Sequence, residues 1–170
     1  MDILEQTFYQ TPYGTLRIAT SSGRLCICDW DGSMANMITS RKVCKALGSN
    51  FKNAISTVAS LTMSQLDEYF AGRRTNFEIP LYPIGTPFQQ NVWTELLKIP
   101  YGQTISYAEE AQRIENPKAV RAVASANRLN PIAIIIPCHR VIGSNKSLTG
   151  YAGGLAAKKF LLELEQDSLK

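Results

Sequence analysis

The chain has 170 residues, with 18 Lys and Arg against 14 Asp and Glu and a formal net charge of +4. This length can hold one sizeable core or two small domains that share an interface. The longest apolar run, residues 132–136, is far too short to cross a bilayer, and the amino end lacks a basic-then-apolar signal sequence. We therefore expect no membrane partner and a cytoplasmic location. The positive charge suits a polyanionic partner, but proteins that bind none often carry it too.

Four cysteines occur in the chain: Cys26, Cys28, Cys44 and Cys138. Without a secretion signal, we expect reduced thiols more than a disulfide framework. A structural zinc site needs four Cys or His ligands, and the amino-terminal part offers only three, so no metal is expected. Cys26 and Cys28 alternate along a predicted strand and should pack on one face as small apolar residues.

The first part of the chain carries strand signals. Residues 15–19 and 25–28 flank a turn at Ser21, Ser22 and Gly23, which predicts a β-hairpin. A helix should follow, because Thr62 stands three residues before Gln65, as in a capping box. Gly72 is placed to end that helix.

A linker should separate this part from the rest. Pro80, Pro83, Gly85 and Pro87 fall close together, and such a density of Pro and Gly breaks regular structure. We therefore predict an amino-terminal α/β domain at residues 1–80, a linker at 81–86 and a second domain at 87–170. The expected fold class is α/β, of the α+β kind, with a small sheet and a helix followed by a mostly helical domain.

The second part begins with two helices that have clear starts. Thr86 is a cap, Pro87 occupies the first helical position and Gln89 closes a capping box. Ser106 and Glu109 form another box, which should open a short helix that runs to about residue 114.

A third helix should cover residues 118–128, with Asn116 as its cap and Pro117 at its start. Two short helices joined by a tight turn form a helix-turn-helix pattern. The second helix carries small residues that should face outward, namely Ala119, Ala122, Ala124, Ser125 and Ala126. Small side chains would let the helix lie close to a duplex, but packing against a neighbouring helix explains them equally well.

Basic residues are concentrated in the same region. Residues 113–140 contain the acid Glu115 and five basic side chains, Arg113, Lys118, Arg121, Arg128 and Arg140. This excess is a weak indication of phosphate contacts, and an ordinary solvated surface would look the same.

The candidate for chemistry is a cysteine beside the single histidine of the chain. Residues 132–136 predict a buried extended segment that leads to Cys138 and His139. A thiolate is a nucleophile, and a nearby base promotes its formation. A neighbouring Cys-His pair alone is more often structural than catalytic, so the wider motif has to decide.

Three runs of sequence surround this pair: Ile136-Pro137-Cys138-His139-Arg140-Val141-Ile142-Gly143, Asn116-Pro117-Lys118-Ala119-Val120-Arg121-Ala122-Val123 with Asn127 and Asn130-Pro131, and Gly150-Tyr151-Ala152-Gly153-Gly154. In their order and spacing they resemble the O6-alkylguanine-DNA alkyltransferases. The resemblance covers about half of the chain, from Pro87 to Glu165. The amino-terminal part matches only in its expected fold.

The resemblance implies direct repair of DNA without a cofactor. Cys138 would take the alkyl group from O6 of guanine in one irreversible displacement, so each molecule would act once. His139 would deprotonate the thiol through a water, and Glu165 would orient the imidazole. Tyr107 would donate to the base and crowd the phosphate, and Asn130 would tie the recognition helix to the cysteine segment.

The resemblance also implies the partner, double-stranded DNA that contains O6-alkylguanine. Arg121 would enter the stack through the minor groove and replace the flipped base. Further DNA contacts are expected from Lys118, Ala119, Ala122, Ser125 and Arg128, and a lesion pocket from Val141, Tyr151, Ala152 and Lys158. The chain is expected to be a monomer in isolation, while cooperative binding on DNA and action on O4-alkylthymine stay open.

Two alternatives remain. A cysteine hydrolase would use a Cys, a His and a carboxylate, but it needs an oxyanion hole and leaves the helix-turn-helix and Arg121 unexplained. A DNA-binding regulator or lesion-binding protein without transfer would explain the helix-turn-helix. It has no need for a cysteine beside a histidine.

Overall fold

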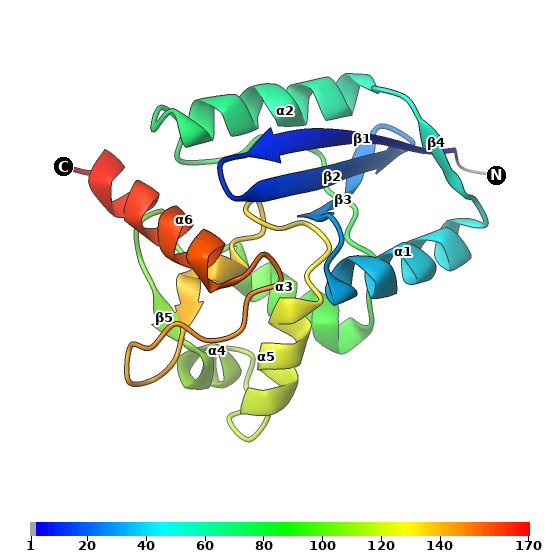
Figure 1. The fold of residues 1–170 in the computed structure, drawn as a ribbon. Coiled ribbons are helices and arrows are strands. Elements are labelled where there is room, and N and C mark those ends of the chain that lie inside the picture. The colour runs from blue at the N-terminus through cyan, green and yellow to red at the C-terminus, as the bar shows by residue number, and fades with distance from the viewer. Residues whose placement is uncertain (1–2) are drawn as a thin grey trace.

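A computed structural model describes residues 3–170 of the chain (Figure 1). Its amino-terminal half contains β1 (Leu4–Thr11), β2 (Gly14–Ser21), β3 (Arg24–Trp30), α1 (Met34–Leu47), β4 (Phe51–Asn53) and α2 (Thr57–Phe70). The strands form one sheet in the order β3-β2-β1-β4, antiparallel except for the parallel pair β1 and β4. Helix α2 packs against β2 and β3, and α1 contacts β3.

The predicted hairpin is confirmed as β2 and β3. Its turn consists of Ser22 and Gly23, which both have positive φ, 51° and 74°. Two such residues in succession are typical of the type I′ turn, whose twist matches that of the flanking strands. The turn therefore fixes the register of the two strands.

The two cysteines of β3 lie in different parts of the core, so the prediction that they share a face is wrong. The pairing register shifts between Ala19 and Thr20, which leaves Cys26 as an extra residue in β3. Such a bulge breaks the alternation of side chains. Cys26 packs in a small cluster with Val43, whereas Cys28 belongs to the central core.

Helix α2 begins earlier than predicted. Ser56 is its N-cap and accepts a hydrogen bond from the Ala59 amide at 3.0 Å. Thr62 lies inside the helix, where its hydroxyl donates to the Val58 carbonyl at 2.8 Å. Thr62 is therefore no cap, because a threonine within a helix can satisfy its hydroxyl on the preceding turn. Gly72, with φ of 74°, follows the end of the helix as predicted.

The carboxyl-terminal half is mostly helical, which confirms the expected α/β class. It contains α3 (Pro87–Leu96), β5 (Ile105–Ser106), α4 (Tyr107–Arg113), α5 (Val120–Arg128), the 3-10 helix η1 (Cys138–Arg140), β6 (Val141–Ile142) and α6 (Leu155–Ser168). Thr86 and Gln89 form the predicted capping box of α3. Ser106 caps α4, but the carboxylate of Glu109 binds Arg113 at 3.0 Å and does not close a box.

Helices α4 and α5 pack on each other as the predicted helix-turn-helix pair. The start of α5 differs from the prediction. Pro117 and Lys118 lie in a turn, and the Ala119 amide donates to the carbonyl of Asn116 at 3.0 Å. Ala119 is therefore the N-cap, and no side chain caps this helix.

Residues 132–136 are buried as predicted, but they are not an extended segment. Only Ile132 pairs with the sheet, opposite Cys28. The chain then turns, with Ile134 at φ of 70° and the Ile136 amide bonded to the Ile132 carbonyl at 3.0 Å. The side chain of Asn130 stabilises this turn, because it accepts from the Ile132 amide at 3.0 Å and donates to the Ile136 carbonyl at 2.8 Å.

Both halves contribute to one central core. Trp30 and Tyr69 come from the first half, and Trp93, Ile132 and Leu161 from the second. The division into residues 1–80, 81–86 and 87–170 stays a prediction. Within residues 3–170, no helix has both the length and the apolar character needed to cross a membrane.

Two later segments cover the outer edge of β3. The Leu25 amide donates to the Pro80 carbonyl, and the Tyr82 amide donates to the Leu25 carbonyl, both at 2.8 Å. Further along the strand, Cys28 forms backbone hydrogen bonds with residues 131 and 133. The segment before α3 and the segment before η1 therefore each form one bridge to this edge of the sheet.

Candidate active site and DNA-binding face

Cys138 is the first residue of η1 and is buried, with 7% of its surface exposed. It follows the turn that the Asn130 side chain stabilises. Burial raises the pKa of the Cys138 thiol to about 11, although Asn130 and the charge of Lys158 act in the opposite direction. The resting thiol is therefore protonated at neutral pH, and it needs a base before it can react.

His139 and Glu165 form a fully buried pair, with 2.6 Å between His139 Nε2 and Glu165 Oε2. An ionised carboxylate only accepts hydrogen bonds, so Nε2 carries the proton and Nδ1 keeps its lone pair. Nδ1 is buried and has no hydrogen-bond partner among residues 3–170. Burial lowers the pKa of His139 in spite of the carboxylate. The imidazole is therefore neutral and can accept a proton at Nδ1.

Besides His139, three groups hold the carboxylate of Glu165. Arg140 donates from Nε to Oε1 at 2.8 Å and from Nη2 to Oε2 at 3.1 Å. The Tyr69 hydroxyl donates to Oε2 at 2.7 Å, and the Gly102 amide donates to Oε1 at 3.1 Å. Burial alone would raise the pKa of Glu165, but the hydrogen bonds and charges of His139 and Arg140 lower it below its usual range. The carboxylate is thus ionised and fixed in one orientation.

Two residues of this cluster were missed by sequence reasoning. Arg140 was counted with the basic residues that could contact phosphate, but it is 6% exposed and binds Glu165 and the Ile99 carbonyl. That interpretation is corrected for Arg140, and its position next to His139 was the available signal. Tyr69 gave no signal, because 96 residues separate it from Glu165.

A second cluster joins Tyr107, Lys158 and Val141. The buried ammonium of Lys158 donates to the carbonyls of Val141 at 2.6 Å and Thr149 at 2.9 Å, and to the Tyr107 hydroxyl at 3.3 Å. The Tyr107 hydroxyl in turn donates to the Thr149 carbonyl at 2.9 Å. Burial lowers the pKa of Lys158 and raises that of Tyr107, and a thiolate at Cys138 raises the pKa of both groups. The two proton donors therefore lie within electrostatic reach of the thiol.

The loop before α6 leans on the sheet. Tyr151 is in edge contact with the indole of Trp30, with 6.0 Å between ring centroids. Gly153 lies so close to the same indole that an added Cβ would be 2.5 Å from Cε2 and 2.7 Å from Cδ2 and Nε1. Ala152 is half-buried between them. Trp30 of β3 thereby sets the position of the loop that carries the predicted pocket residues.

We predict that Gly153→Ala slows the reaction of Cys138 and lowers the free energy of unfolding by about 1–3 kcal/mol, as overpacking does. The added methyl would displace either the loop or Trp30. Urea unfolding and single-turnover rates measure the two effects. The control is the same substitution in a Trp30→Leu background, where the added methyl has room and should cost less than it does beside Trp30. A single variant as stable as the wild type would contradict this packing.

The outer face of α5 and its turn is basic and has small side chains. Lys118, Arg121, Ala122, Ser125 and Arg128 are exposed, and Ala119 and Ala124 are half-buried. Ala126 is buried, so its predicted outward orientation is wrong. Trp93 of α3 covers that side and donates from Nε1 to the Ala126 carbonyl at 2.9 Å. The helix thus packs through one side and presents the other to a partner.

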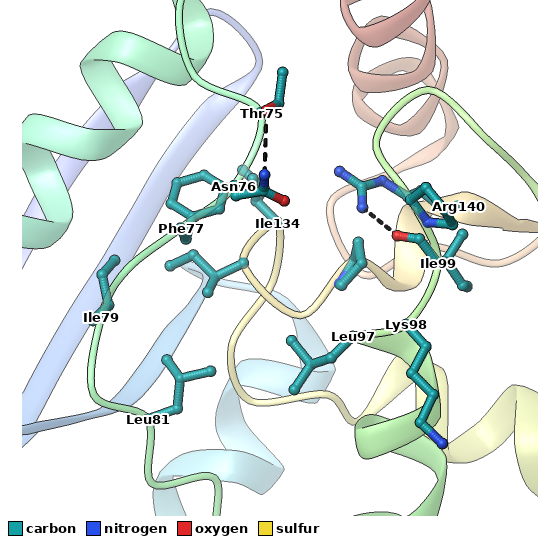
Figure 2. A pocket seen from close by; sticks show the side chains of 13 residues that line it. Thr75, Asn76, Phe77, Ile79, Leu81, Leu97, Lys98, Ile99, Ile134 and Arg140 are labelled. Carbon is teal, nitrogen blue, oxygen red and sulfur yellow. Dashed lines mark hydrogen bonds between the residues drawn. The ribbon is translucent and has the colours of Figure 1, made fainter.

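A cavity of about 320 Å³ lies beside the reactive segment (Figure 2). Pro137 and Arg140 line it, together with Ile134, Leu97 and Phe77. Arg140 closes one wall by donating to the Ile99 carbonyl at 2.7 Å. Apart from Arg140, none of the residues predicted for catalysis, DNA or phosphate contacts or the lesion pocket lines this cavity.

The fold and site therefore define a helix-turn-helix protein with a buried thiol next to a His-Glu pair. Residues 87–167 match the family described as 6-O-methylguanine DNA methyltransferase, DNA binding domain. Residues 4–83 match its ribonuclease-like domain. The chain belongs to the 6-O-methylguanine DNA methyltransferase family.

Individual relatives agree with this assignment. A methylated-DNA–protein-cysteine methyltransferase of Methanosarcina mazei is 58% identical over 107 residues, which cover 63% of this chain and 68% of the relative. A constitutive one of Bacillus subtilis is 56% identical, over 62% of this chain and 65% of the relative. These alignments thus span about two thirds of each relative. The crystal structure of Mycobacterium tuberculosis OGT in complex with DNA has a TM-score of 0.83 and 41% identity, and the match covers 96% of this chain and 94% of that one.

Proposed function

We propose that the chain repairs DNA by transferring the alkyl group of O6-alkylguanine to Sγ of Cys138. The observation that carries this proposal is the buried thiol beside a neutral histidine, whose Nδ1 lacks a partner among residues 3–170 and whose Nε2 binds Glu165. The support from outside the site is the family membership and the similarity to a structure with bound DNA.

The transfer is one displacement at the alkyl carbon. The Sγ proton passes through a water to His139 Nδ1, which Glu165 makes more basic through Nε2. The Sγ–C bond forms as the C–O6 bond breaks, and the electron pair stays on the guanine. The guanine takes up one proton, for which Tyr107 and Lys158 are the donors at hand. Atoms and charge balance without a co-reactant.

The damaged base reaches this site by rotating out of the duplex. The exposed face of α5 binds the DNA, with Arg121 in the space that the base leaves. Lys118, Ala119, Ala122, Ser125 and Arg128 provide further contacts. Val141, Tyr151 and Ala152 enclose the guanine, and Asn130 holds Cys138 in place through the turn at residues 132–136.

The protein acts as a stoichiometric reagent on duplex DNA. A thioether has no leaving group that water displaces under mild conditions, so one molecule repairs one lesion. The protein needs no partner subunit for this chemistry, because all the groups named come from one chain.

The test is intact mass spectrometry after incubation with a duplex that carries one O6-methylguanine. We expect a single gain of about 14 Da, one methylene unit, on the intact protein, and digestion should place it on the peptide that contains Cys138. Undamaged duplex is the control and should give no gain. Binding of the damaged duplex without a change in mass would contradict transfer and favour a lesion-binding protein.

A further inference from the structure

A buried carboxyl group joins the two helices of the DNA-binding pair. Glu110 of α4 is fully buried, and Asn127 of α5 is 5% exposed. Asn127 Nδ2 donates to Glu110 Oε1 at 2.8 Å. Neither side chain has a part in the proposed transfer.

The remaining oxygens of this pair lack a donor. Glu110 Oε2 and Asn127 Oδ1 are both buried, and neither has a hydrogen-bond partner in the described part of the chain, residues 3–170. Buried polar atoms are nearly always hydrogen-bonded, so two orphaned acceptors on one bonded pair need an explanation.

One proton accounts for both orphaned atoms. A protonated carboxyl group has an O–H donor as well as an acceptor. A proton on Glu110 Oε2 can be donated to Asn127 Oδ1, while Asn127 Nδ2 already donates to Oε1. The acid and the amide would then exchange two hydrogen bonds in a ring.

The charges around Glu110 are consistent with this state. Burial raises the pKa of Glu110 to about 7, and Glu95 of α3 acts in the same direction. Asn127 and Arg113 oppose the rise. Tyr107 and Cys138 also interact with Glu110. Of the other elements that contact α4, α5 carries the exposed Arg121 and Arg128, and β5 and β6 have no ionisable side chain.

The pair lies where it can affect both DNA binding and the reactive segment. Asn127 is on the same helix as Arg121 and precedes Arg128. The backbone carbonyl of Asn127 also accepts a hydrogen bond from the backbone amide of Asn130 at 3.2 Å. The side chain of Asn130 in turn stabilises the turn before Cys138. Loss of the Glu110–Asn127 contact would therefore loosen the end of α5.

We propose that Glu110 is a positioning residue for DNA binding, which in its protonated form fixes α5 on α4 through a double hydrogen bond with Asn127. When Glu110 ionises, Oε2 and Oδ1 repel each other and α5 is held less firmly. The inference rests on the proposed function, since it assumes that α5 binds DNA.

The sign of the pH effect follows from proton binding. Glu110 has a higher pKa in the folded chain than its ordinary value of 4.5, so the folded state holds an extra proton between pH 4.5 and about 7. The stability that Glu110 contributes is full below the lower value and is lost as the pH rises through the upper one. Tight binding of DNA should decline as the pH rises through about 7, where Glu110 ionises in the folded chain.

The experiment compares wild type with Glu110→Gln, both with Cys138→Ser to prevent transfer. Glutamine offers a permanent donor and acceptor in the same shape, so it imitates the protonated acid. Fluorescence anisotropy would give the affinity for a duplex with O6-methylguanine between pH 6 and 8.5. We expect a several-fold loss for wild type and a nearly flat profile for Glu110→Gln. Thermal unfolding at pH 6 should give similar midpoints for the two proteins.

The matched control is Glu109→Gln on the neighbouring residue. Glu109 is exposed and paired with Arg113, so this variant should keep the wild-type pH slope. Equal slopes for wild type and Glu110→Gln would overturn the role of Glu110 and leave the proposed function intact. Absence of DNA binding by every variant at every pH would overturn both.

Discussion

Replacing Cys138 with serine is expected to abolish alkyl transfer while the protein still binds damaged DNA. A serine hydroxyl fits the same buried position, but it is a far weaker nucleophile than a thiolate. The rate should fall by more than about 10³-fold, as for other nucleophiles supported by a histidine and a carboxylate. Release of a fluorescent benzyl label from O6-benzylguanine to the protein measures the transfer, and anisotropy with damaged duplex measures the binding.

Cys44→Ser is the control for that variant. Cys44 is a half-buried thiol in α1, in the other half of the molecule. Its loss should leave both transfer and binding unchanged. Residual labelling of the Cys138→Ser protein, or loss of labelling in Cys44→Ser, would show that another thiol accepts the alkyl group.

Glu165→Gln is expected to slow transfer by about 10²–10⁴-fold, the usual contribution of general base catalysis. Glutamine is neutral, so it cannot stabilise the imidazolium that forms when His139 takes the proton. It also leaves Arg140 buried without its counter-charge. Breaking a buried ion pair in this way costs about 3–5 kcal/mol. Urea unfolding and single-turnover rates measure the two effects separately.

Glu163→Gln on the same helix is the control. Its carboxylate is exposed and lies 3.9 Å from Lys159. Its removal should change the free energy of unfolding by less than about 0.5 kcal/mol and leave the rate unchanged. If folded Glu165→Gln reacted as fast as wild type, the carboxylate would have only a structural role.

The helix caps show what the sequence could predict. Thr86 and Ser106 start α3 and α4 as expected, because a cap depends on residues a few positions apart. The prediction of Thr62 as a cap was wrong, because a pattern of residues this short fits a helix interior as well as a helix start. Only the packing of the neighbouring turn distinguishes the two.

The sequence did not predict helix α1, because several of its apolar side chains are exposed while a polar one is buried. Met34, Met37 and Ile38 are exposed, while Asn36 is buried. The Asn36 amide donates to Asp29 at 2.9 Å, in a buried network with Arg17. A polar anchor of this kind gives no apolar periodicity that could be recognised in the sequence.

The candidate site was predictable where its residues are close in sequence. Cys138 and His139 are neighbours, and family resemblance added Glu165 from α6. Tyr69 and Gly102 complete the carboxylate's partners across long distances in the chain. A tyrosine in one helix and a backbone amide in one loop have no distinctive pattern, so only the fold could bring them together.

The covered edge of β3 affects how the two halves can evolve. The contacts at this edge include backbone hydrogen bonds, of Leu25 with Pro80 and Tyr82 and of Cys28 with residues 131 and 133. Such bonds tolerate most side chains, so substitutions can accumulate on both sides while the seam stays intact. A deletion or insertion that shifted either segment by one residue would instead turn its side chains to the opposite face. Selection should therefore constrain the lengths of these connections more strongly than their composition.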